Sequence, residues 1–346
     1  MKSIVEKLVE NRNLSDEEFL EILQTNEYDE RLFVEADRVR REWYGDEVYL
    51  RGLIEFTNYC KNNCYYCGIR RDNQKASRYR MTLDDILATC DRGYRMGFRT
   101  FVLQGGEDPF FTDERICEIV KEIRKRFPDC AITLSIGEKS RESYQSYYEA
   151  GANRYLLRHE TATDEHYARL HPSEMSLENR KQCLFDLKEI GYQVGAGFMV
   201  GSPFQTMENI VADLRFLQQL EPDMIGIGPF ISHRDTPFEQ YKSGTLELTL
   251  RILAILRLLF PYVLLPATTA LGTIHPQGRE LGLKAGANVM MPNLSPQEVR
   301  EKYMLYDNKI CVNEDSDQCF GCTQRRVSSV GYRVVTDVGN VKKDRH

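Results

Sequence analysis

The sequence has no apolar run near 18 residues, so it contains no segment typical of a membrane-spanning helix. Acidic residues stand near the N-terminus, where a secretory signal would carry its hydrophobic region. Basic residues are not in excess either, because the formal net charge is −6 and the pI is near 5.7. Nucleic-acid binding usually needs a basic face. We therefore expect a cytoplasmic protein that binds neither membrane nor nucleic acid.

The ten cysteines do not have the spacing of a disulfide framework. Clusters together with isolated thiols suit metal binding in a reducing compartment better than disulfide pairing. The four scattered cysteines are expected to be small buried hydrophobic residues. The other six form two close groups, Cys60/Cys64/Cys67 and Cys311/Cys319/Cys322.

The 346 residues are enough for one large α/β domain. Residues 1–47 are predicted to form a helical cap, because Ser15 is a suitable N-cap before acidic and then apolar positions. Residues 48–295 alternate short β-like runs with amphipathic helices, and residues 296–346 form a C-terminal segment with the second cysteine group. Eight runs fit a complete (βα)8 TIM-type barrel: 53–56, 100–103, 131–134, 154–157, 194–200, 224–227, 262–265 and 288–291.

Chemically useful residues follow the predicted strands. In such a barrel the loops after the strand C-termini share one face, where function collects. The first cysteine group follows the first strand and a Gly-Gly-Glu sequence follows the second. We expect the polar residues after these and the later strands to share one cavity.

The loop Cys60-Lys61-Asn62-Asn63-Cys64-Tyr65-Tyr66-Cys67 places three thiols within eight residues. Three cysteines can bind three irons of a cubane and leave one iron open to an external ligand, whereas four close every iron, as suits an electron carrier. A zinc loop is the competing interpretation, but zinc usually takes Cys-x2-Cys pairs and a fourth Cys or His in the same small module. No His lies between Cys67 and His159, so the pattern favours a [4Fe–4S] cluster with one open iron.

This loop, with the aromatic Tyr66 before its last cysteine, resembles the signature of the radical S-adenosylmethionine (SAM) superfamily. The resemblance implies that the three cysteines hold the catalytic cluster and that SAM binds its open iron through the amino and carboxylate groups. It also implies reductive cleavage of SAM to methionine and a 5′-deoxyadenosyl radical. Gly105-Gly106-Glu107 resembles the superfamily's GGE motif, whose backbone contacts the SAM amino group. By itself this tripeptide would more often be a βα turn with a helix-cap carboxylate.

Further SAM contacts are predicted from chemistry. A methionine carboxylate suits a bidentate guanidinium, and a ribose diol suits a carboxylate acceptor. Arg158, Glu160 and Arg180 are therefore candidates, although Arg180 has the alternative of an ordinary helix-surface charge. Thr268 and Thr269 are the candidates for substrate binding. The rest of the predicted cofactor-binding set is Tyr66, Gln104, Gly105, Gly106, Glu107 and Ser135.

The second cysteine group lies beyond the last predicted strand and has the spacing Cys311-x7-Cys319-x2-Cys322. Three thiolates at this spacing can hold an auxiliary iron–sulfur cluster, [2Fe–2S] or [4Fe–4S], with a fourth ligand from water or elsewhere. Zinc or unligated thiols are the alternatives. From the order of the strands we expect this group near the surface and away from the chemistry.

Longer runs narrow the resemblance to the HydE family of [FeFe]-hydrogenase maturases, in the biotin-synthase-like branch. It implies an enzyme that acts on a small iron- and sulfur-containing precursor while the two-iron subcluster of the hydrogenase H-cluster is built. The implied partners are other hydrogenase maturation proteins and a low-potential electron donor. Methylornithine synthase and biotin synthase are rivals within the branch, and a noncatalytic iron–sulfur carrier is the alternative of another class. The similar runs are 64–73, 102–109, 155–162, 226–231 and 266–270.

Overall fold

A parallel sheet of six strands, in the order β2-β3-β4-β5-β6-β8, forms the centre of the computed structural model. The model describes residues 2–313 and 315–343, so residues 1, 314 and 344–346 of the predicted terminal segments lie outside the described residues. Spatial neighbours in this sheet follow one another along the chain, as in repeated βα units. The strands are β2 (Gly52–Thr57), β3 (Thr100–Gly105), β4 (Ala131–Ser135), β5 (Arg154–Leu156), β6 (Gln193–Ala196) and β8 (Met224–Ile225).

Single parallel bridges continue the pairing beyond both edges of this sheet. They join Met224 to Leu264, Pro266 to Val289, and Asn293 back to Leu53 of β2. Hydrogen bonds support the bridges, since Ile225 N donates to the Leu264 carbonyl at 3.0 Å and Leu53 N donates to the Pro292 carbonyl at 2.9 Å. The segments near residues 264–266 and 289–293 therefore lie between β8 and β2.

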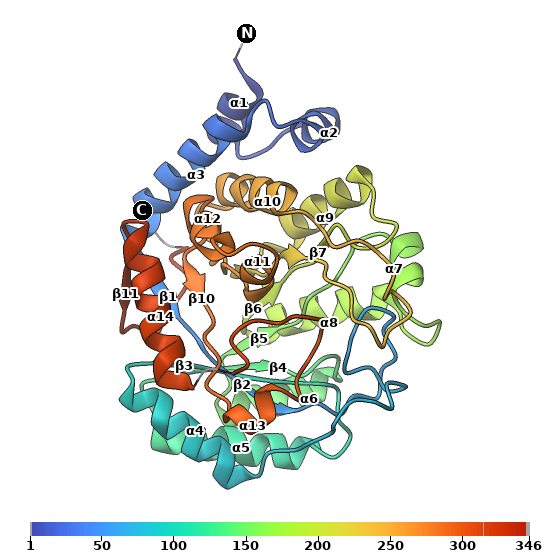
Figure 1. Ribbon diagram of the computed structural model, residues 1–346, viewed down its shortest axis with the longest axis vertical. Helices are drawn as coiled ribbons and strands as arrows, with labels where there is room; N and C mark the ends of the chain where they lie inside the picture. The colour runs from blue at the N-terminus through green and yellow to red at the C-terminus, as the bar shows by residue number, and fades with distance from the viewer. Residues whose placement is uncertain (1, 314, 344–346) are drawn as a thin grey trace.

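Helices lie around the outside of the central strands (Figure 1). Local signals set their ends: Thr82 and Asp85 form the predicted capping box of α4, and Gly151 and Gly191 end two helices in left-handed conformations. The helices are α4 (Leu83–Arg95), α5 (Asp113–Arg126), α6 (Arg141–Ala150), α7 (Asp164–Leu170), α8 (Leu177–Ile190), α9 (Met207–Leu220), α10 (Leu246–Leu259), α11 (Thr269–Ile274) and α12 (Gly278–Lys284).

The N-terminal helices are α1 (Ile4–Asn11), α2 (Asp16–Gln24) and α3 (Asp29–Tyr44). Ser15 caps α2 as predicted. An apolar stripe on α3 is buried, and α3 runs alongside α10 (Figure 1). The Arg251 guanidinium of α10 binds the Asp29 carboxylate at 2.6 and 2.8 Å, which fixes the start of α3.

The terminal segments meet in a second sheet with the order β10-β1-β11. It contains β1 (Glu47–Leu50), β10 (Val289–Met290) and β11 (Arg333–Val335), and α13 (Gln297–Arg300) and α14 (Ser316–Ser329) precede β11. A short pair, β7 (Met199–Val200) and β9 (Gly228–Pro229), stands apart from both sheets. No helix in the described part of the chain is long and apolar enough to cross a membrane.

The structure confirms the first four predicted strands. It shortens the run 224–227 to β8, shortens the run 288–291 to β10 of the second sheet, and corrects the other two runs. The run 194–200 is interrupted at Gly197, whose φ is +151° and where a Cβ would stand 2.0 Å from the Gly226 carbonyl oxygen. The run 262–265 forms only the bridge at Leu264. Pro261 and Pro266 flank it, and proline cannot donate to a strand ladder.

Candidate active site

The first cysteine group lies in the loop between β2 and α4, which side chains hold in place. The Arg78 guanidinium donates to the carbonyl oxygens of Ile69, Arg70 and Asn73 at 2.9, 2.7 and 3.2 Å. The Asn58 amide donates to Ser77 O at 2.8 Å. Hydrogen bonds to backbone carbonyls, rather than a helix or strand, therefore set the shape of this loop.

The three thiols of this loop are close enough to influence one another electrostatically. Cys60, Cys64 and Cys67 are half-buried residues, and burial of their sulfur atoms raises the pKa of all three thiols. The pKa of Cys67 rises to about 12. A bound metal deprotonates such thiols, so iron binding here replaces protons.

Within residues 2–313 and 315–343, no three His, Cys, Asp or Glu side chains converge as ligands of one ion. In a cubane each thiolate binds its own iron, and the cluster occupies the space between the sulfurs.

The Gly105-Gly106-Glu107 turn, at the end of β3, presses against the cysteine loop. A Cβ at Gly106 would stand 2.1 Å from the Tyr59 carbonyl oxygen and 2.7 Å from the Cys60 Cβ. The Lys61 N–H donates to the Glu107 carbonyl at 2.9 Å. Close approach of the two backbones requires glycine at position 106.

The Glu107 carboxylate joins three loops. It accepts a hydrogen bond from the Glu138 N–H at 3.0 Å and forms an ion pair with the Lys61 Nζ at 3.2 Å. Gly137, with φ +78°, makes room for it, since a Cβ there would meet Glu107 Oε1 at 2.1 Å. The side chain of Glu107 therefore supports the turn, which leaves the backbone of the motif as the part able to meet a ligand.

Arg158 and Glu160 follow β5 and carry polar atoms without hydrogen-bond partners. Arg158 Nη2 and Glu160 Oε2 are 3.2 Å apart but are not aligned as a hydrogen bond. These two atoms, Arg158 Nε and Thr268 Oγ1 are buried and unsatisfied. Glu160 also has a left-handed backbone, with φ +66°. Unsatisfied buried groups and backbone strain are typical of ligand-binding sites.

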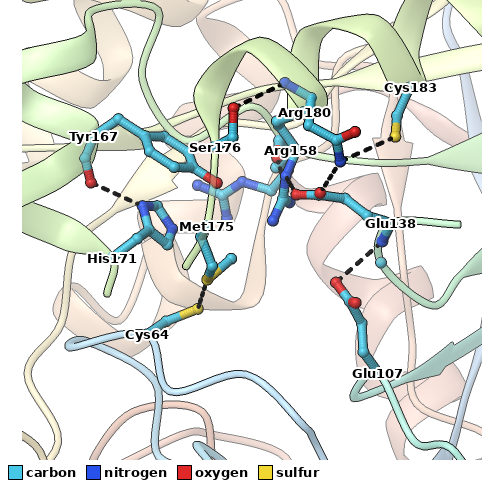
Figure 2. A network of polar contacts seen from close by, with 12 residues as sticks. Cys64, Glu107, Glu138, Arg158, Tyr167, His171, Met175, Ser176, Arg180 and Cys183 are labelled. Atoms are coloured by element: carbon cyan, nitrogen blue, oxygen red, sulfur yellow. Dashed lines mark hydrogen bonds and ion pairs between the residues drawn. The ribbon is translucent and has the colours of Figure 1, made fainter. Parts of the chain in front are cut away.

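Arg180 lies on α8 and is only 8% exposed. The alternative interpretation of this residue as an ordinary charge on the helix surface is therefore wrong. It forms an ion pair with Glu138, and its Nη1 donates to the Arg158 carbonyl at 3.1 Å. Burial opposes its charge, yet Glu138 and Tyr167 hold the pKa of Arg180 well above its ordinary value. Figure 2 shows the Arg158 and Arg180 side chains beside Glu138. Arg180 thus links the β4 and β5 loops.

The other predicted ligand contacts lie at or beyond the C-terminal ends of strands. Gln104 and Ser135 pair in register at the ends of β3 and β4 and are half-buried. The Gln104 amide is 3.4 Å from the Tyr303 hydroxyl. Thr268 precedes α11, and Thr269 is its first residue. The structure therefore brings the predicted contacts to the C-terminal ends of neighbouring strands.

A cleft of about 840 Å³ opens beside the cysteine loop, and Glu107 is the predicted ligand contact that lines it. Its lining comes from four loops and includes Lys61, Glu107, Glu138 and Met175. Two neighbours of the cysteine loop were not predicted from the sequence. Met175 Sδ is 3.8 Å from the Cys64 Sγ, and His171 Nε2 is 3.1 Å from the Tyr66 hydroxyl. Neither residue belongs to a sequence motif. Their nearness to the cysteine loop appears only in the folded chain.

One member of the second cysteine group is buried, since Cys319 is only 2% exposed. Arginines surround it: Arg279 Nη2 is 3.9 Å from the Cys311 Sγ, and Arg326 Nε is 3.4 Å from the Cys322 Sγ. A contact with Cys311, followed by burial, raises the pKa of Cys319. Cys311 and Cys322 are half-buried, so the expected position of the group near the surface stays a prediction.

Known proteins have sequences similar to this one. The radical SAM superfamily matches residues 54–217. The [FeFe] hydrogenase maturase subunit HydE of Thermotoga maritima is 48% identical over 344 residues, which are 99% of this chain and 98% of that protein. This chain belongs to the HydE family of radical SAM enzymes.

Proteins outside the HydE family have a similar sequence or fold. The 3-methylornithine synthase of Methanosarcina acetivorans is 31% identical over 94% of this chain and 92% of its own. A crystal structure of methylornithine synthase covers 96% of this chain and 97% of its own, with a TM-score of 0.85 and 29% identity. A crystal structure of the maturase HydG covers 96% of this chain and 75% of its own, with a TM-score of 0.81 and 20% identity. At this identity the similarity concerns the fold alone.

Membership of the radical SAM superfamily implies a [4Fe–4S] cluster and SAM. The residues of the site fit both groups. One loop supplies three thiols without a fourth cysteine, which suits a cluster with an open iron. The unsatisfied guanidinium atoms of Arg158 and the unsatisfied oxygen of Glu160 suit the carboxylate and hydroxyl groups of SAM.

Proposed function

We propose that this radical SAM enzyme acts in assembly of the two-iron subcluster of the [FeFe]-hydrogenase H-cluster. The observation that carries the proposal is the 48% identity to a HydE maturase across 99% of the chain. The substrate would be a small iron- and sulfur-containing precursor. The other hydrogenase maturation proteins and a low-potential electron donor would be its partners.

Within this function, each part of the site has a separate task. When bound, the cluster and SAM supply reductive cleavage of the sulfonium and a 5′-deoxyadenosyl radical. Cys60, Cys64 and Cys67 hold the iron, and the backbone of Gly105 and Gly106 meets the SAM amino group. Arg158 and Glu160 orient SAM through its carboxylate and ribose, while Thr268 and Thr269 face the substrate.

We also propose that the parallel sheet closes into a complete (βα)8 barrel across residues 48–295. The bridges at Leu264, Pro266 and Asn293 support closure, because they connect β8 to β2. Residues 1–47 would cover the barrel from outside, and residues 296–346 would carry the second cysteine group. A barrel would bring the loops after its strands around one SAM and substrate cavity.

The second cysteine group is proposed to hold an auxiliary iron–sulfur cluster. Its arginine neighbours support this assignment, since guanidinium groups offset the negative charge of thiolate-bound iron. Free thiols and reduced clusters both need a reducing compartment, which favours the cytoplasm.

The proposal is tested in two steps. The protein is reconstituted anaerobically with iron and sulfide and reduced, and 5′-deoxyadenosine formed from SAM is measured. It is then added to a hydrogenase apoprotein with the other maturation proteins, and hydrogen production is measured. We expect both activities in the wild type and in Cys117→Ala, which removes a cysteine outside both groups, and neither in Cys64→Ala.

The results separate the competing functions. SAM cleavage without hydrogenase activation, together with formation of methylornithine from lysine, would favour the methylornithine synthase alternative, which the TM-score of 0.85 supports. A fully loaded and reduced protein that leaves SAM intact would favour the iron–sulfur carrier.

A further inference from the structure

The linker between α7 and α8 packs directly on the cysteine loop. The Leu170 carbonyl accepts a hydrogen bond from the Tyr65 N–H at 3.0 Å. The Tyr66 hydroxyl is 3.1 Å from His171 Nε2, and the Met175 and Cys64 sulfurs are 3.8 Å apart. Figure 2 shows His171 and Met175 on the same side of Cys64. Three successive residues of the loop therefore contact the end of α7 or this linker.

The hydrogen bond between Tyr66 and His171 has a defined direction. His171 Nδ1 is 3.1 Å from the Tyr167 carbonyl oxygen, which can only accept, so Nδ1 carries the proton. Burial, followed by the charge of Arg180, lowers the pKa of His171 to about 3, which keeps the imidazole neutral. Its Nε2 is then an acceptor, and the Tyr66 hydroxyl is the donor.

The imidazole has little freedom to turn away from Tyr66. The ring is stacked on the Tyr167 ring, with centroids 4.0 Å apart and planes at 25°. It meets the Tyr66 ring edge-on at 5.4 Å. Only 1% of His171 is exposed. The acceptor atom therefore stands in a fixed position before the cluster is loaded.

The far end of the linker is anchored to the SAM-contact residues. Ser176 caps α8 by accepting a hydrogen bond from the Asn179 N–H at 3.2 Å. One turn later, Arg180 binds Glu138 and donates to the Arg158 carbonyl at 3.1 Å. The linker and the start of α8 thus connect the cysteine loop to the backbone that carries Arg158.

We propose that His171 is a positioning residue for SAM cleavage. By accepting the hydrogen bond of the Tyr66 hydroxyl, it fixes Tyr66 and the neighbouring Cys67 relative to Arg158, on the side of the cavity where SAM would bind. The inference rests on the SAM contacts assigned under the proposed function. It does not depend on the identity of the substrate or on hydrogenase maturation.

The test compares His171→Phe with His171→Gln in the reconstituted and reduced holoenzyme. Phenylalanine keeps a ring to stack on Tyr167 but has no acceptor, whereas glutamine offers a carbonyl acceptor without a ring. The readouts are the KM for SAM, the maximal rate of SAM cleavage and the change that SAM causes in the electron paramagnetic resonance spectrum of the reduced cluster.

We expect His171→Phe to raise the KM for SAM about fivefold, the effect of one ordinary hydrogen bond, and to weaken the spectral change at a fixed SAM concentration. Glutamine should return the KM to within about twofold of the wild type. Tyr66→Phe should match His171→Phe, and the double variant should be no worse than either single variant, because both remove the same bond. Tyr148→Phe, at an exposed tyrosine, serves as the matched control.

Three results would overturn the inference: a wild-type KM in His171→Phe, additive effects in the double variant, or loss of cluster iron from His171→Phe, which would assign His171 to folding of the loop. Failure of the proposed function looks different. A wild type that cleaves SAM but activates no hydrogenase would reject the maturation role and leave the comparison of His171 variants intact.

Discussion

Individual thiols in the first loop are protonated when no metal is bound. Burial raises the pKa of each, and that of Cys67 rises to about 12. The thiolate is the form that reacts with electrophiles and binds iron. A metal-free protein is therefore expected to be slow to alkylate, although these residues are partly exposed.

Cys67 in the metal-free protein should react with iodoacetamide about 100-fold more slowly than free cysteine at pH 8. The raised pKa lowers the thiolate fraction by about 1,000-fold, and the greater nucleophilicity of a more basic thiolate recovers about 10-fold. The rate should keep increasing above pH 9, because the thiolate fraction increases until the pH reaches the pKa. Mass spectrometry of the Cys67 peptide measures it. A rate equal to that of free cysteine would contradict the burial argument.

Arg158 offers a second test at the scale of one side chain. Its guanidinium has buried atoms without partners, so Arg158→Gln should weaken SAM binding about 10- to 100-fold, the range expected for a charge-assisted hydrogen bond. Arg141→Gln, which removes an exposed arginine paired with Asp186, is the control. Equilibrium dialysis with the reconstituted but unreduced holoenzyme, which binds SAM without cleaving it, gives the Kd. Equal affinities for SAM in the two variants would remove Arg158 from the site.

At the scale of the elements, the end of β3 lies very close to the cysteine loop. Gly106→Ala places a methyl group 2.1 Å from the Tyr59 carbonyl oxygen, and the two backbones must separate. We expect at least a tenfold loss of 5′-deoxyadenosine formation and a loss of about 1–3 kcal/mol in stability.

The matched substitution is Gly321→Ala in α14, where the nearest atom to a new Cβ is the end of the Arg325 side chain at 3.5 Å. It should leave SAM cleavage unchanged and slightly stabilise the helix. Full activity in Gly106→Ala would show that the close approach has no role in catalysis.

At the opposite end of the strands, Arg154 of β5 fastens the C-terminal tail. It donates to Thr100 Oγ1 at 3.0 Å, the Val338 carbonyl at 3.0 Å and Asn340 Oδ1 at 2.7 Å. Arg154→Leu removes these charge-assisted hydrogen bonds, although Thr100 Oγ1 still donates to the Val338 carbonyl and Gln193 Nε2 to Asn340 Oδ1, both at 2.9 Å. The free energy of unfolding should therefore fall by about 3 kcal/mol. Denaturant unfolding measures the change. SAM cleavage at 25 °C should persist, and its loss would mean that the tail shapes the site.

Elements with strong local signals could be predicted from the sequence. Ser15 and Thr82 cap helices as predicted, and short β-like runs between amphipathic helices predicted β3 and β4. The cysteine loop and the GGE turn could be located because their residue types are diagnostic. The contact of Tyr66 with His171, residues 105 apart along the chain, could not be predicted, since it depends on how a linker folds back over a loop. The bridge at Leu264 replaced a full strand because prolines stand on both sides of the run.

On the scale of the whole molecule, the two cysteine groups are joined by the segment 302–309. The Leu305 carbonyl accepts a hydrogen bond from the Gly68 N–H at 2.8 Å, and Lys309 Nζ binds the buried Glu55 carboxylate at 2.6 Å. Cys311 follows two residues later. These anchors hold the segment independently of any metal at Cys311.

Replacing Cys319 with Ser should therefore remove iron from the second group alone. Iron analysis should show a partial loss, while 5′-deoxyadenosine formation stays within about twofold of the wild type, because the anchors at Gly68 and Glu55 stay in place. Loss of SAM cleavage in this variant would contradict the separation of the two groups.

The contact between the first cysteine loop and the C-terminal segment also bears on when the site can form in a growing chain. The Asn58 amide donates to the carbonyl of Lys302, 244 residues later, at 2.7 Å. At about 5 to 20 residues per second, the ribosome needs about 10 to 50 s to add Lys302 after Asn58. During that interval the three thiols exist in a loop without its closing hydrogen bond. Iron delivered in this interval would meet an incomplete binding site. We therefore expect the cluster to be inserted after the C-terminal segment has been translated.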